Sequence, residues 1–482
     1  MKRVLAIDQG TTATKTYVLD SEGKFEFCSS VEHDQIYPQS GWVEHDPETL
    51  LGNIQSVIGA VKDIDAIGID NQGETVIAWD CQSGLPVYNA IVWQDHRTTD
   101  FIAELKSRGA ETLTLEKAGL PLDPYFSASK LRWILKNIPE AQKLLREDRL
   151  RFGTSESFFI YRLTGEYATD VTTASRTSLM NLKTCCWDPE LCEIFEVPVH
   201  ILPEIRPTTA YFGSLKSNHR DIPITASVVD QQAALLGHGC YKEGQTKVTF
   251  GTGVFALANV GQTIKCDPSS GILSTVAWQL AGEEPVYAVD AGVYNAGSAV
   301  NWARSLGLFN DFTAIDDFKN SAALSRGLVF VPALSGLACP YWDRSAAGLW
   351  LGMSLETTKE DLCQAVLEGI ALRTAQVLDA IARLTGRQQI LSVDGGLINN
   401  SYFCQFLANL TQCDIVVPAS PDITTYGTGR FALIGAGAVK QPTALPEADE
   451  PKAIIIPQKD LSHLKDLFQE AVARSRNWRR NP

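Results

Sequence analysis

Residues 4–12 read VLAIDQGTT, which is a run of four apolar residues, a carboxylate, and then a turn that contains glycine and two threonines. The apolar run is typical of a buried β-strand, and the glycine predicts a bend into a returning strand over residues 16–20. A third β-rich run follows over residues 24–28. The chain is therefore expected to open as an antiparallel meander, with Asp8 at the end of its first strand.

The second half of the chain repeats this pattern. Residues 246–250 form a predicted strand that enters the turn 251–253 (GTG), and a β-rich run leads away from it. A further short strand ends at residues 394–396 (DGG), ahead of a helical pattern. The repetition indicates a duplication and predicts an α/β fold of two related domains, residues 1–236 and 237–482, with a cleft between them.

Two helices have clear starting signals. Asp46 and Pro47 stand directly before apolar residues at helical spacing, so Asp46 is the expected N-cap. A long helix is predicted to begin at Thr357, with Glu360 completing a capping box three residues later. These helices would pack against the predicted strands.

The composition narrows the classes of function. The 482 residues include 42 basic and 56 acidic side chains, a net charge of −14, which disfavours a broad surface for nucleic acid or an anionic membrane. The longest apolar run, residues 431–439, is shorter than the ~20 residues that cross a bilayer, and the apolar run at the start is too short for a signal peptide. A cytoplasmic protein is expected, and the 11 cysteines, which contain no CxxC pair, are expected to be reduced.

Three glycine-rich turns follow predicted strands, at residues 9–12, 251–253 and 395–396. Glycine lets backbone N–H groups approach a phosphate, and threonine hydroxyls add hydrogen bonds. Each turn alone is more typical of an ordinary tight turn, whereas three in corresponding places favour a phosphate site. None matches the P-loop or the dinucleotide fingerprint. Lys15, just past the first turn, would add a positive charge.

Two carboxylates stand where predicted strands end. Asp8 precedes the first glycine turn, and Asp230 comes before Gln231. Phosphoryl transfer needs a group that holds Mg²⁺ and a group that orients or deprotonates the attacking hydroxyl, and carboxylates suit both tasks. A turn former is an equally good interpretation of Asp8, and a helix N-cap of Asp230.

Three aromatic residues could bind a polyhydroxy compound. Trp93, Tyr125 and Phe255 provide ring faces for such a ligand, although aromatic residues are more often part of a core. The sequence contains no nucleophile elbow that would support hydrolase chemistry at His96, and no second histidine at the spacing of a zinc site. We therefore interpret His96 as a surface or structural residue.

Seven segments, in consistent order over about nine-tenths of the chain, resemble the FGGY family of carbohydrate kinases and, within it, most closely the glycerol kinases. The resemblance implies two actin-like, ribonuclease-H-like domains of the ASKHA type that close on ATP and a substrate. The matching segments are residues 6–12 (AIDQGTT), 41–47 (GWVEHDP), 88–95 (YNAIVWQD), 123–127 (DPYFS), 174–177 (ASRT), 230–234 (DQQAA) and 393–396 (VDGG).

The resemblance also implies an activity and the residues that perform it. The protein would use ATP and Mg²⁺ to phosphorylate a primary hydroxyl of glycerol or a related polyol or sugar, with Asp230 as the catalytic base and Asp8 as a holder of Mg²⁺. The implied substrate-binding residues are Glu74, Trp93, Tyr125, Asp230, Gln231 and Phe255. The implied nucleotide-binding residues are Thr11, Thr12, Lys15, Thr252, Gly297, Asn301, Gly396 and Asn400.

Four positions depart from the family pattern. Lys15 and Ala347 each replace an arginine, and Val229 replaces a glycine before the catalytic aspartate. Gly73 stands where glycerol kinases have an arginine that binds glycerol hydroxyls. Loss of that charged donor predicts roughly ten- to hundredfold weaker glycerol binding, and the vacated volume would admit a longer polyol or a ketose.

The alternative hypothesis is a non-catalytic nucleotide or polyol sensor with the same fold. It would be stabilised by ligands without releasing ADP. The expected partner is a small-molecule polyol or sugar rather than nucleic acid or a membrane. A homodimer or tetramer would be typical of the family.

Overall fold

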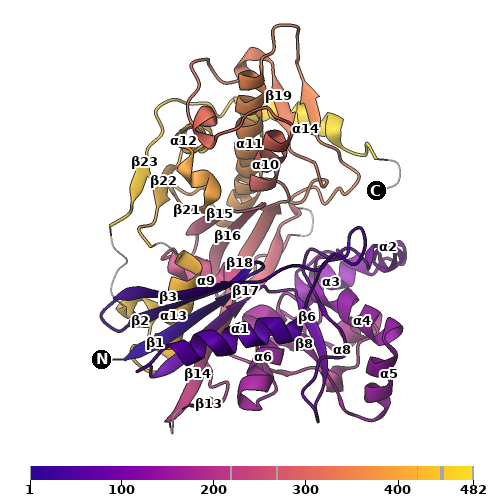
Figure 1. Cartoon of the computed structure of the whole chain (residues 1–482). Helices are drawn as coiled ribbons and strands as arrows, with labels where there is room; N and C mark the ends of the chain where they lie inside the picture. Colours follow the sequence, from indigo (N-terminus) through magenta and orange to yellow (C-terminus); the bar gives the residue numbers. More distant parts are fainter. Residues whose placement is uncertain (1, 218–219, 268–269, 421, 446–449, 480–482) are drawn as a thin grey trace.

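The computed structural model describes residues 2–217, 220–267, 270–420, 422–445 and 450–479. Two large sheets lie at its centre, one in each half of the chain (Figure 1). In spatial order, the strands of the first sheet are β13 (Ser214–Ser217), β14 (Arg220–Val229), β5 (Ala66–Asn71), β1 (Arg3–Gln9), β2 (Ala13–Asp20) and β3 (Phe25–Glu32). The strands of the second sheet are β17 (Leu273–Trp278), β18 (Val286–Val293), β16 (Val254–Gly261), β15 (Thr246–Phe250), β21 (Ile390–Gly395), β22 (Asp414–Val417) and β23 (Ala453–Ile455).

The two sheets contain the same strand pattern, which confirms the predicted two-part α/β fold. In the first, β1 pairs antiparallel with β2 and parallel with β5, which in turn pairs parallel with β14. In the second, β15 pairs antiparallel with β16 and parallel with β21, which pairs parallel with β22. Parallel strands end at the same edge of a sheet, so the turns and carboxylates that follow these strands gather in one region.

Burial explains why these runs form strands. The side chains of Val4, Leu5, Ala6 and Ile7 on β1 are fully buried, and every residue of β5 is buried as well. Strands covered on both faces have continuous apolar runs of this kind. The meander and the strand over residues 246–250 therefore form as the apolar runs predict.

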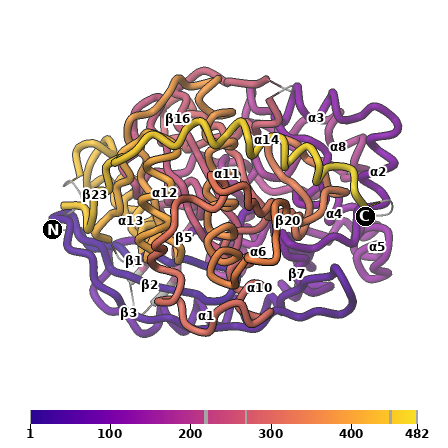
Figure 2. Tube along the Cα trace, turned by 90° about the horizontal axis from the view of Figure 1, so that it is seen from above, coloured from indigo at the N-terminus to yellow at the C-terminus, as the bar shows by residue number. Residues whose placement is uncertain are grey.

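Helices cover both sheets and build two lateral lobes. In the first half they are α1 (Pro47–Ala60), α2 (Thr99–Ser107), α3 (Glu111–Ala118), α4 (Ser127–Asn137), α5 (Pro139–Arg146), α6 (Ser155–Thr164), α7 (Val171–Ala174), α8 (Pro189–Ile194) and α9 (Asp230–Gly237). In the second half they are α10 (Gly297–Ser305), α11 (Lys359–Thr385), α12 (Ser401–Thr411), α13 (Ile423–Gly435) and α14 (Leu464–Ser475). Seen from above, α14 runs beside the long helix α11, against which it packs (Figure 2).

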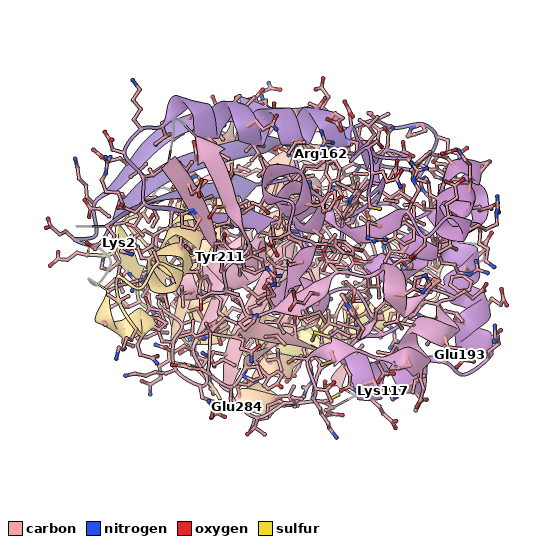
Figure 3. The ribbon with its side chains drawn as sticks, turned by 90° about the horizontal axis from the view of Figure 1, so that it is seen from below. Lys2, Lys117, Arg162, Glu193, Tyr211 and Glu284 are labelled. Carbon is pink, nitrogen blue, oxygen red and sulfur yellow. The ribbon has the colours of Figure 1, made fainter. Side chains whose placement is uncertain are left out.

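The smaller sheets complete the lobes. One contains β4 (Glu44–His45), β7 (Ala90–Ile91), β6 (Val76–Asp80) and β8 (Leu150–Thr154). Three two-stranded sheets pair β9 (Ala168–Asp170) with β12 (Glu204–Arg206), β10 (Met180–Asn181) with β11 (Cys186–Trp187), and β19 (Val329–Val331) with β20 (Leu349–Leu351). Charged side chains such as Lys117 and Glu193 lie at the outer edge of the molecule, where water solvates them (Figure 3).

Helices α9 and α13 cross each other closely. A Cβ on Gly427 would stand 1.9 Å from the carbonyl oxygen of Ala233, so only glycine fits at the crossing. Helix α13 also packs on the first sheet, where Thr225 Oγ1 donates a hydrogen bond to the carbonyl of Ala432 at 2.9 Å. A segment late in the chain, helix α13, thus covers the N-terminal sheet. The domain boundary near residue 237 stays a prediction.

The helix starts are mostly as expected. Asp46 caps α1 by accepting a hydrogen bond from the N–H of Glu48, as predicted. The predicted capping box of α11 is wrong by one residue: Thr358 is the N-cap and Asp361 completes the box. Among the described residues, no helix is both long enough and apolar enough to cross a membrane. Each of the eleven cysteines is free.

Candidate active site

Three neighbouring cavities lie along the seam between the two sheets. We call them the aromatic cavity, which contains Trp93, Tyr125 and Phe255; the glycine cavity, which contains Gly297 and Gly396; and the acidic cavity, which contains Asp8 and Lys15. Thr252 lines both the aromatic and the glycine cavity, and Gly396 lines both the glycine and the acidic cavity. The three cavities therefore adjoin one another, and we call them together the cleft.

The aromatic cavity, of about 260 Å³, brings together the three predicted aromatic residues. The ring of Trp93 meets those of Tyr125 and Phe255 edge to face, with centroids 5.7 and 6.3 Å apart. Trp93 Nε1 donates a hydrogen bond to Thr11 Oγ1 at 3.2 Å, which connects this wall to the first glycine turn. Ring faces held in this way suit the C–H groups of a carbohydrate, while polar groups around them bind its hydroxyls.

A buried chain of charges reaches the aromatic cavity, which Arg176 and Asp290 line. Arg176 Nε donates to Glu74 Oε1 at 2.7 Å, and Arg176 Nη1 lies 2.9 Å from Asp290 Oδ2. All three side chains are at most 9% exposed. Burial raises the pKa of Glu74, and the charge of Arg176 opposes this shift. Asp290 was not predicted as a site residue, because it lies in none of the seven matching segments. Arg176 lies in the matching segment 174–177 (ASRT), which is the only feature of the sequence that points to it.

Asp230 is the first residue of α9 and follows β14 directly. Its Oδ1 accepts a hydrogen bond from the N–H of Gln231 at 2.6 Å. Burial, together with the nearby carboxylate of Glu74, raises the pKa of Asp230 to about 6, whereas Lys247 and the hydrogen bonds from Gln231 oppose the shift. A carboxylate with this pKa is ionised at neutral pH and is still basic enough to accept a proton.

Lys247, on β15, is another residue that the sequence analysis missed. Its side chain is fully buried, and its ammonium group donates to Gln231 Oε1 and, at 3.0 Å, to Thr249 Oγ1. Burial lowers its pKa, and the carboxylates of Asp394 and Asp230 oppose this change. A buried cation beside the predicted base stabilises the ionised form of that base. A lone lysine within a strand pattern offers no signal of this role.

Asp8, which lines the acidic cavity, lies opposite the fully buried Asp70 on the adjacent parallel strands β1 and β5. Burial raises the pKa of Asp8 to about 7, with the charge of Asp422 adding to the shift, and burial also raises the pKa of Asp70. The hydroxyl of Thr428 donates to Asp70 Oδ2. Lys15 lies nearby and forms an ion pair of 3.0 Å with Asp422.

This carboxylate pair fits Mg²⁺. The ion is usually held by one or two carboxylates together with phosphate oxygens and water, and a divalent cation would offset the repulsion between Asp8 and Asp70. No group of three or more potential ligand side chains is found in the part of the chain that the structure describes.

The glycine cavity gathers five of the predicted nucleotide residues, and its volume is about 600 Å³. Gly297 begins α10, and its N–H donates to the carbonyl of Gly251 at 3.0 Å. Asn400 uses both polar side-chain atoms within the protein, because Nδ2 donates to Ile315 O and Oδ1 accepts from Phe403 N, each at 2.7 Å. These two hydrogen bonds fix the orientation of the Asn400 side chain in the wall and leave one N–H and one lone pair for a ligand. The five residues are Thr252, Gly297, Asn301, Gly396 and Asn400.

The remaining predicted residues lie in the first turn. Thr11 accepts the hydrogen bond from Trp93, and the carbonyl of Thr12 accepts one from His33 N at 3.0 Å. At Gly73, a Cβ would stand 3.0 and 3.3 Å from the γ-carbons of Val229, so this side chain takes the space directly beside residue 73. The two departures from the family pattern, at residues 73 and 229, therefore lie in contact. Room for a longer acceptor at this position stays a prediction.

Comparison with known proteins identifies the family of the chain. Residues 3–237 match the N-terminal domain of the FGGY family of carbohydrate kinases, and residues 246–436 match its C-terminal domain. Two relatives are the glycerol kinase of Corynebacterium efficiens, 39% identical over 461 residues (91% of this chain and 90% of the relative), and that of Mycoplasmoides gallisepticum, 38% identical over 500 residues (99% and 98%).

Two solved structures have the same fold. One is the glycerol kinase of Plasmodium falciparum with ADP, with a TM-score of 0.90, 31% identity and coverage of 98% of both chains. The other is a ligand-bound xylulose kinase from Lactobacillus acidophilus, with a TM-score of 0.87, 25% identity and coverage of 98% of this chain and 97% of that one. The likeness extends over both sheets and the cleft between them.

Proposed function

Because this chain belongs to the FGGY family of carbohydrate kinases, we propose that it transfers the γ-phosphate of ATP to a primary hydroxyl of glycerol or a related polyol or sugar. The activity of the relatives named glycerol kinase supports this assignment. The chain keeps the residue types that such a reaction needs. Trp93, Tyr125 and Phe255 line the aromatic cavity, and Asp8 and Lys15 line the acidic cavity, whereas Glu74, Asp230 and Gln231 line none of the three cavities. A kinase accelerates phosphoryl transfer mainly by positioning its substrates and by stabilising the charge of the transition state.

The environment of Asp230 is the observation that carries the proposal. Its carboxylate has a pKa of about 6, lies beside Glu74, and is stabilised by the ammonium group of Lys247. Asp230 accepts the proton of the attacking hydroxyl as the new O–P bond forms. Gln231, bound to Lys247, keeps the Asp230 carboxylate oriented through its own N–H.

The walls of the cleft would position the two substrates. Trp93, Tyr125 and Phe255 hold the carbon skeleton of the acceptor, and Glu74 accepts a hydrogen bond from one of its hydroxyls. Thr252 and Gly297 support the phosphates, with Asn301, Gly396 and Asn400 along the rest of the nucleotide. Closure of the cleft excludes water, which favours transfer to the acceptor over hydrolysis of ATP.

Asp8, with Asp70 beside it, would hold Mg²⁺ next to the phosphates, and Lys15, Thr11 and Thr12 would lie close by. When bound, Mg²⁺ neutralises charge on the phosphate oxygens. The chain's own contribution is to keep two buried carboxylates available at this place. At this end of the cleft, the two carboxylates would attract the metal ion, and the lysine would attract the phosphate.

The direct test is release of ADP by the purified protein with MgATP and glycerol, other polyols or ketoses as acceptors. Release that depends on an acceptor is expected. A folded protein that is stabilised by nucleotide and acceptor, yet releases no ADP with any of them, would contradict the proposal and support the sensor. No finding favours the sensor. The homodimer or tetramer and the cytoplasmic location stay predictions.

A further inference from the structure

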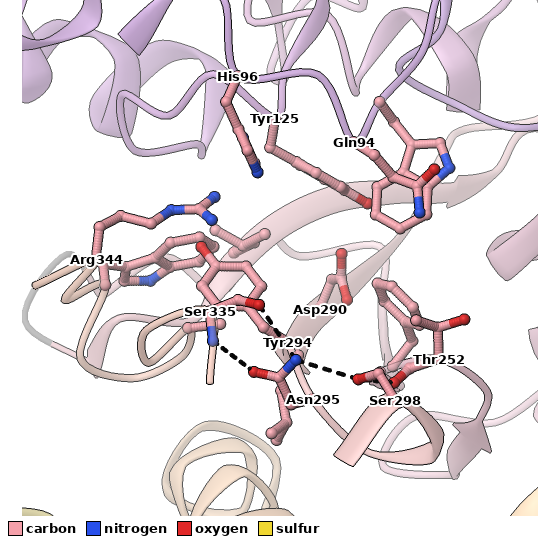
Figure 4. Close-up of a pocket in the computed structure, with 18 of the residues that line it drawn as sticks. Gln94, His96, Tyr125, Thr252, Asp290, Tyr294, Asn295, Ser298, Ser335 and Arg344 are labelled. Carbon is pink, nitrogen blue, oxygen red and sulfur yellow. Dashed lines mark hydrogen bonds between the residues drawn. The ribbon is translucent and has the colours of Figure 1, made fainter. Parts of the chain in front are cut away.

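The part of the aromatic cavity that carries Tyr125 is a short loop. The side chain of Tyr125 extends from this loop into the cavity, above Asp290 (Figure 4). The loop, residues 123–126, leads into α4, which begins at Ser127. Asp123 shapes the loop from its start, because its Oδ1 accepts a hydrogen bond from Tyr125 N at 2.9 Å and its carbonyl accepts one from Phe126 N at 3.3 Å. The place of the Tyr125 ring therefore depends on how this loop is held.

The ammonium group of Lys130 holds the loop from within the protein. It donates hydrogen bonds to three successive carbonyls, those of Pro124 and Tyr125, each at 2.6 Å, and that of Phe126 at 3.3 Å. Lys130 is fully buried and lines none of the three cavities. A lysine ammonium has three N–H donors, so these three carbonyls use all of them. Lys130 thus acts on the loop and does not touch a ligand in the cleft.

This is a costly place for a cation. Lys130 lies in the first turn of α4, where the helix dipole disfavours positive charge. Burial lowers its pKa to about 8; three nearby carboxylates oppose this shift, and one guanidinium adds to it. The charged and titratable groups that face Lys130 are Glu74, Asp95, Asp123, His96 and Arg97. A buried apolar side chain would avoid the cost of burying a charge, but it could not bind the three carbonyls.

The ring of Tyr125 has few other contacts that would locate it. It meets the rings of Trp93 and Phe126 edge to face, with centroids 5.7 and 5.2 Å apart. Among the residues that the structure describes, none forms a hydrogen bond with the Tyr125 hydroxyl. The ring is therefore located mainly by its own backbone, and that backbone is bound by Lys130.

We propose that Lys130 is a positioning residue for the acceptor: by binding the carbonyls of residues 124–126, it holds the Tyr125 ring where the acceptor packs against it. This inference rests on the proposed kinase activity and adds to it a residue outside the cleft. A neutral lysine has two N–H groups and no charge, so it holds the loop less firmly. Acceptor binding should therefore weaken when Lys130 loses its proton.

The first test compares Lys130→Met with the unchanged protein, using the acceptor of highest kcat/KM among glycerol, other polyols and ketoses. The KM for this acceptor at pH 7 should rise at least about tenfold, as for loss of charged hydrogen bonds. The KM for MgATP should change less than about twofold, because Tyr125 does not line the glycine cavity. Lys136→Met is the matched control and should change neither KM, since Lys136 also lies on α4 and forms an ion pair but is exposed.

A double-mutant cycle separates positioning from a general loss of stability. If Lys130 acts through Tyr125, adding Lys130→Met to Tyr125→Ala should raise the acceptor KM by less than about twofold beyond that of Tyr125→Ala alone. A full tenfold increase on the Tyr125→Ala background would overturn the inference. So would an equal increase in both KM values in Lys130→Met.

The pH dependence of the unchanged protein gives a second measurement. Because the pKa of Lys130 is about 8, the acceptor KM should rise between about pH 7 and pH 9 toward the value of Lys130→Met, and the variant should lack this rise. Lys130→Gln, whose amide keeps two N–H donors and does not titrate, replaces Lys130→Met if that variant does not fold.

Two further outcomes have different meanings. An acceptor KM that stays constant over this pH range, or that rises equally in the variant, would overturn the inference and leave the kinase activity intact. Absence of ADP release with every acceptor would instead contradict the proposed function itself.

Discussion

The side chain of Val229 packs against Gly73, with its γ-carbons 3.0 and 3.3 Å from the point where a Cβ on Gly73 would stand. These residues are 156 positions apart in the sequence, yet both depart from the family pattern at the same place in the cleft. Val229 therefore occupies the space that the Cβ of an arginine at residue 73 would need. The two departures therefore depend on each other.

Restoring the arginine should require both changes. Gly73→Arg alone forces its Cβ against Val229 and is expected to destabilise the fold by about 1–3 kcal/mol, the usual cost of overpacking. Gly73→Arg with Val229→Gly should recover part of that loss and lower the KM for glycerol about tenfold or more. Thermal unfolding and glycerol kinetics of the two single variants and the double variant measure this. Additive effects on Tm would show that the residues are independent.

Removing the proposed base should abolish most turnover. Asp230→Asn is expected to lower kcat by at least about 10²-fold, because the amide cannot accept the proton of the acceptor hydroxyl. Stabilisation by MgATP should persist, since the nucleotide is proposed to bind in the glycine cavity, which Asp230 does not line. Asp221→Asn, at an exposed position of strand β14, which precedes Asp230, is the control and should keep its activity. Full turnover in Asp230→Asn would remove this residue from the mechanism.

The acid limb of the pH profile should reflect Asp230. Because the base acts in its deprotonated form, and its pKa is about 6, kcat/KM should fall about tenfold per pH unit below pH 6. Lys247 lowers the pKa of Asp230, so Lys247→Met should move this limb to higher pH. Lys242→Met, at an exposed site, should leave the limb in place. An unmoved limb in Lys247→Met would show that the ammonium group does not act on the base.

The start of α10 should tolerate no side chain at Gly297. A Cβ there would stand 2.7 Å from the carbonyl oxygen of Gly251, whereas a Cβ on Gly251 would meet nothing within 4 Å. Gly297→Ala is therefore expected to lower Tm by roughly 2–10 °C and to weaken stabilisation by ADP. Gly251→Ala should leave the Tm of the ligand-free protein unchanged. Equal Tm values for the two variants would contradict the close approach.

Several elements could be predicted because their signals are local. The apolar run before Asp8 and the glycine turn after it suffice for a buried strand and a bend. Asp46 before Pro47 predicts an N-cap, and the structure has it. The start of α11 is one residue later than predicted, because Thr357 and Thr358 are both good caps and Asp361 completes the box as well as Glu360 would.

By itself, the sequence determined the order of the strands and helices, the duplicated glycine turns and the set of residues shared with a family of kinases. Only the tertiary structure decided which charges meet. Arg176 lies between Glu74 and Asp290, and Lys247 lies beside Asp230, although each contact joins distant segments. The reason is physical: a strand or turn depends on neighbouring residues, whereas the partner of a buried charge is set by how separate elements pack.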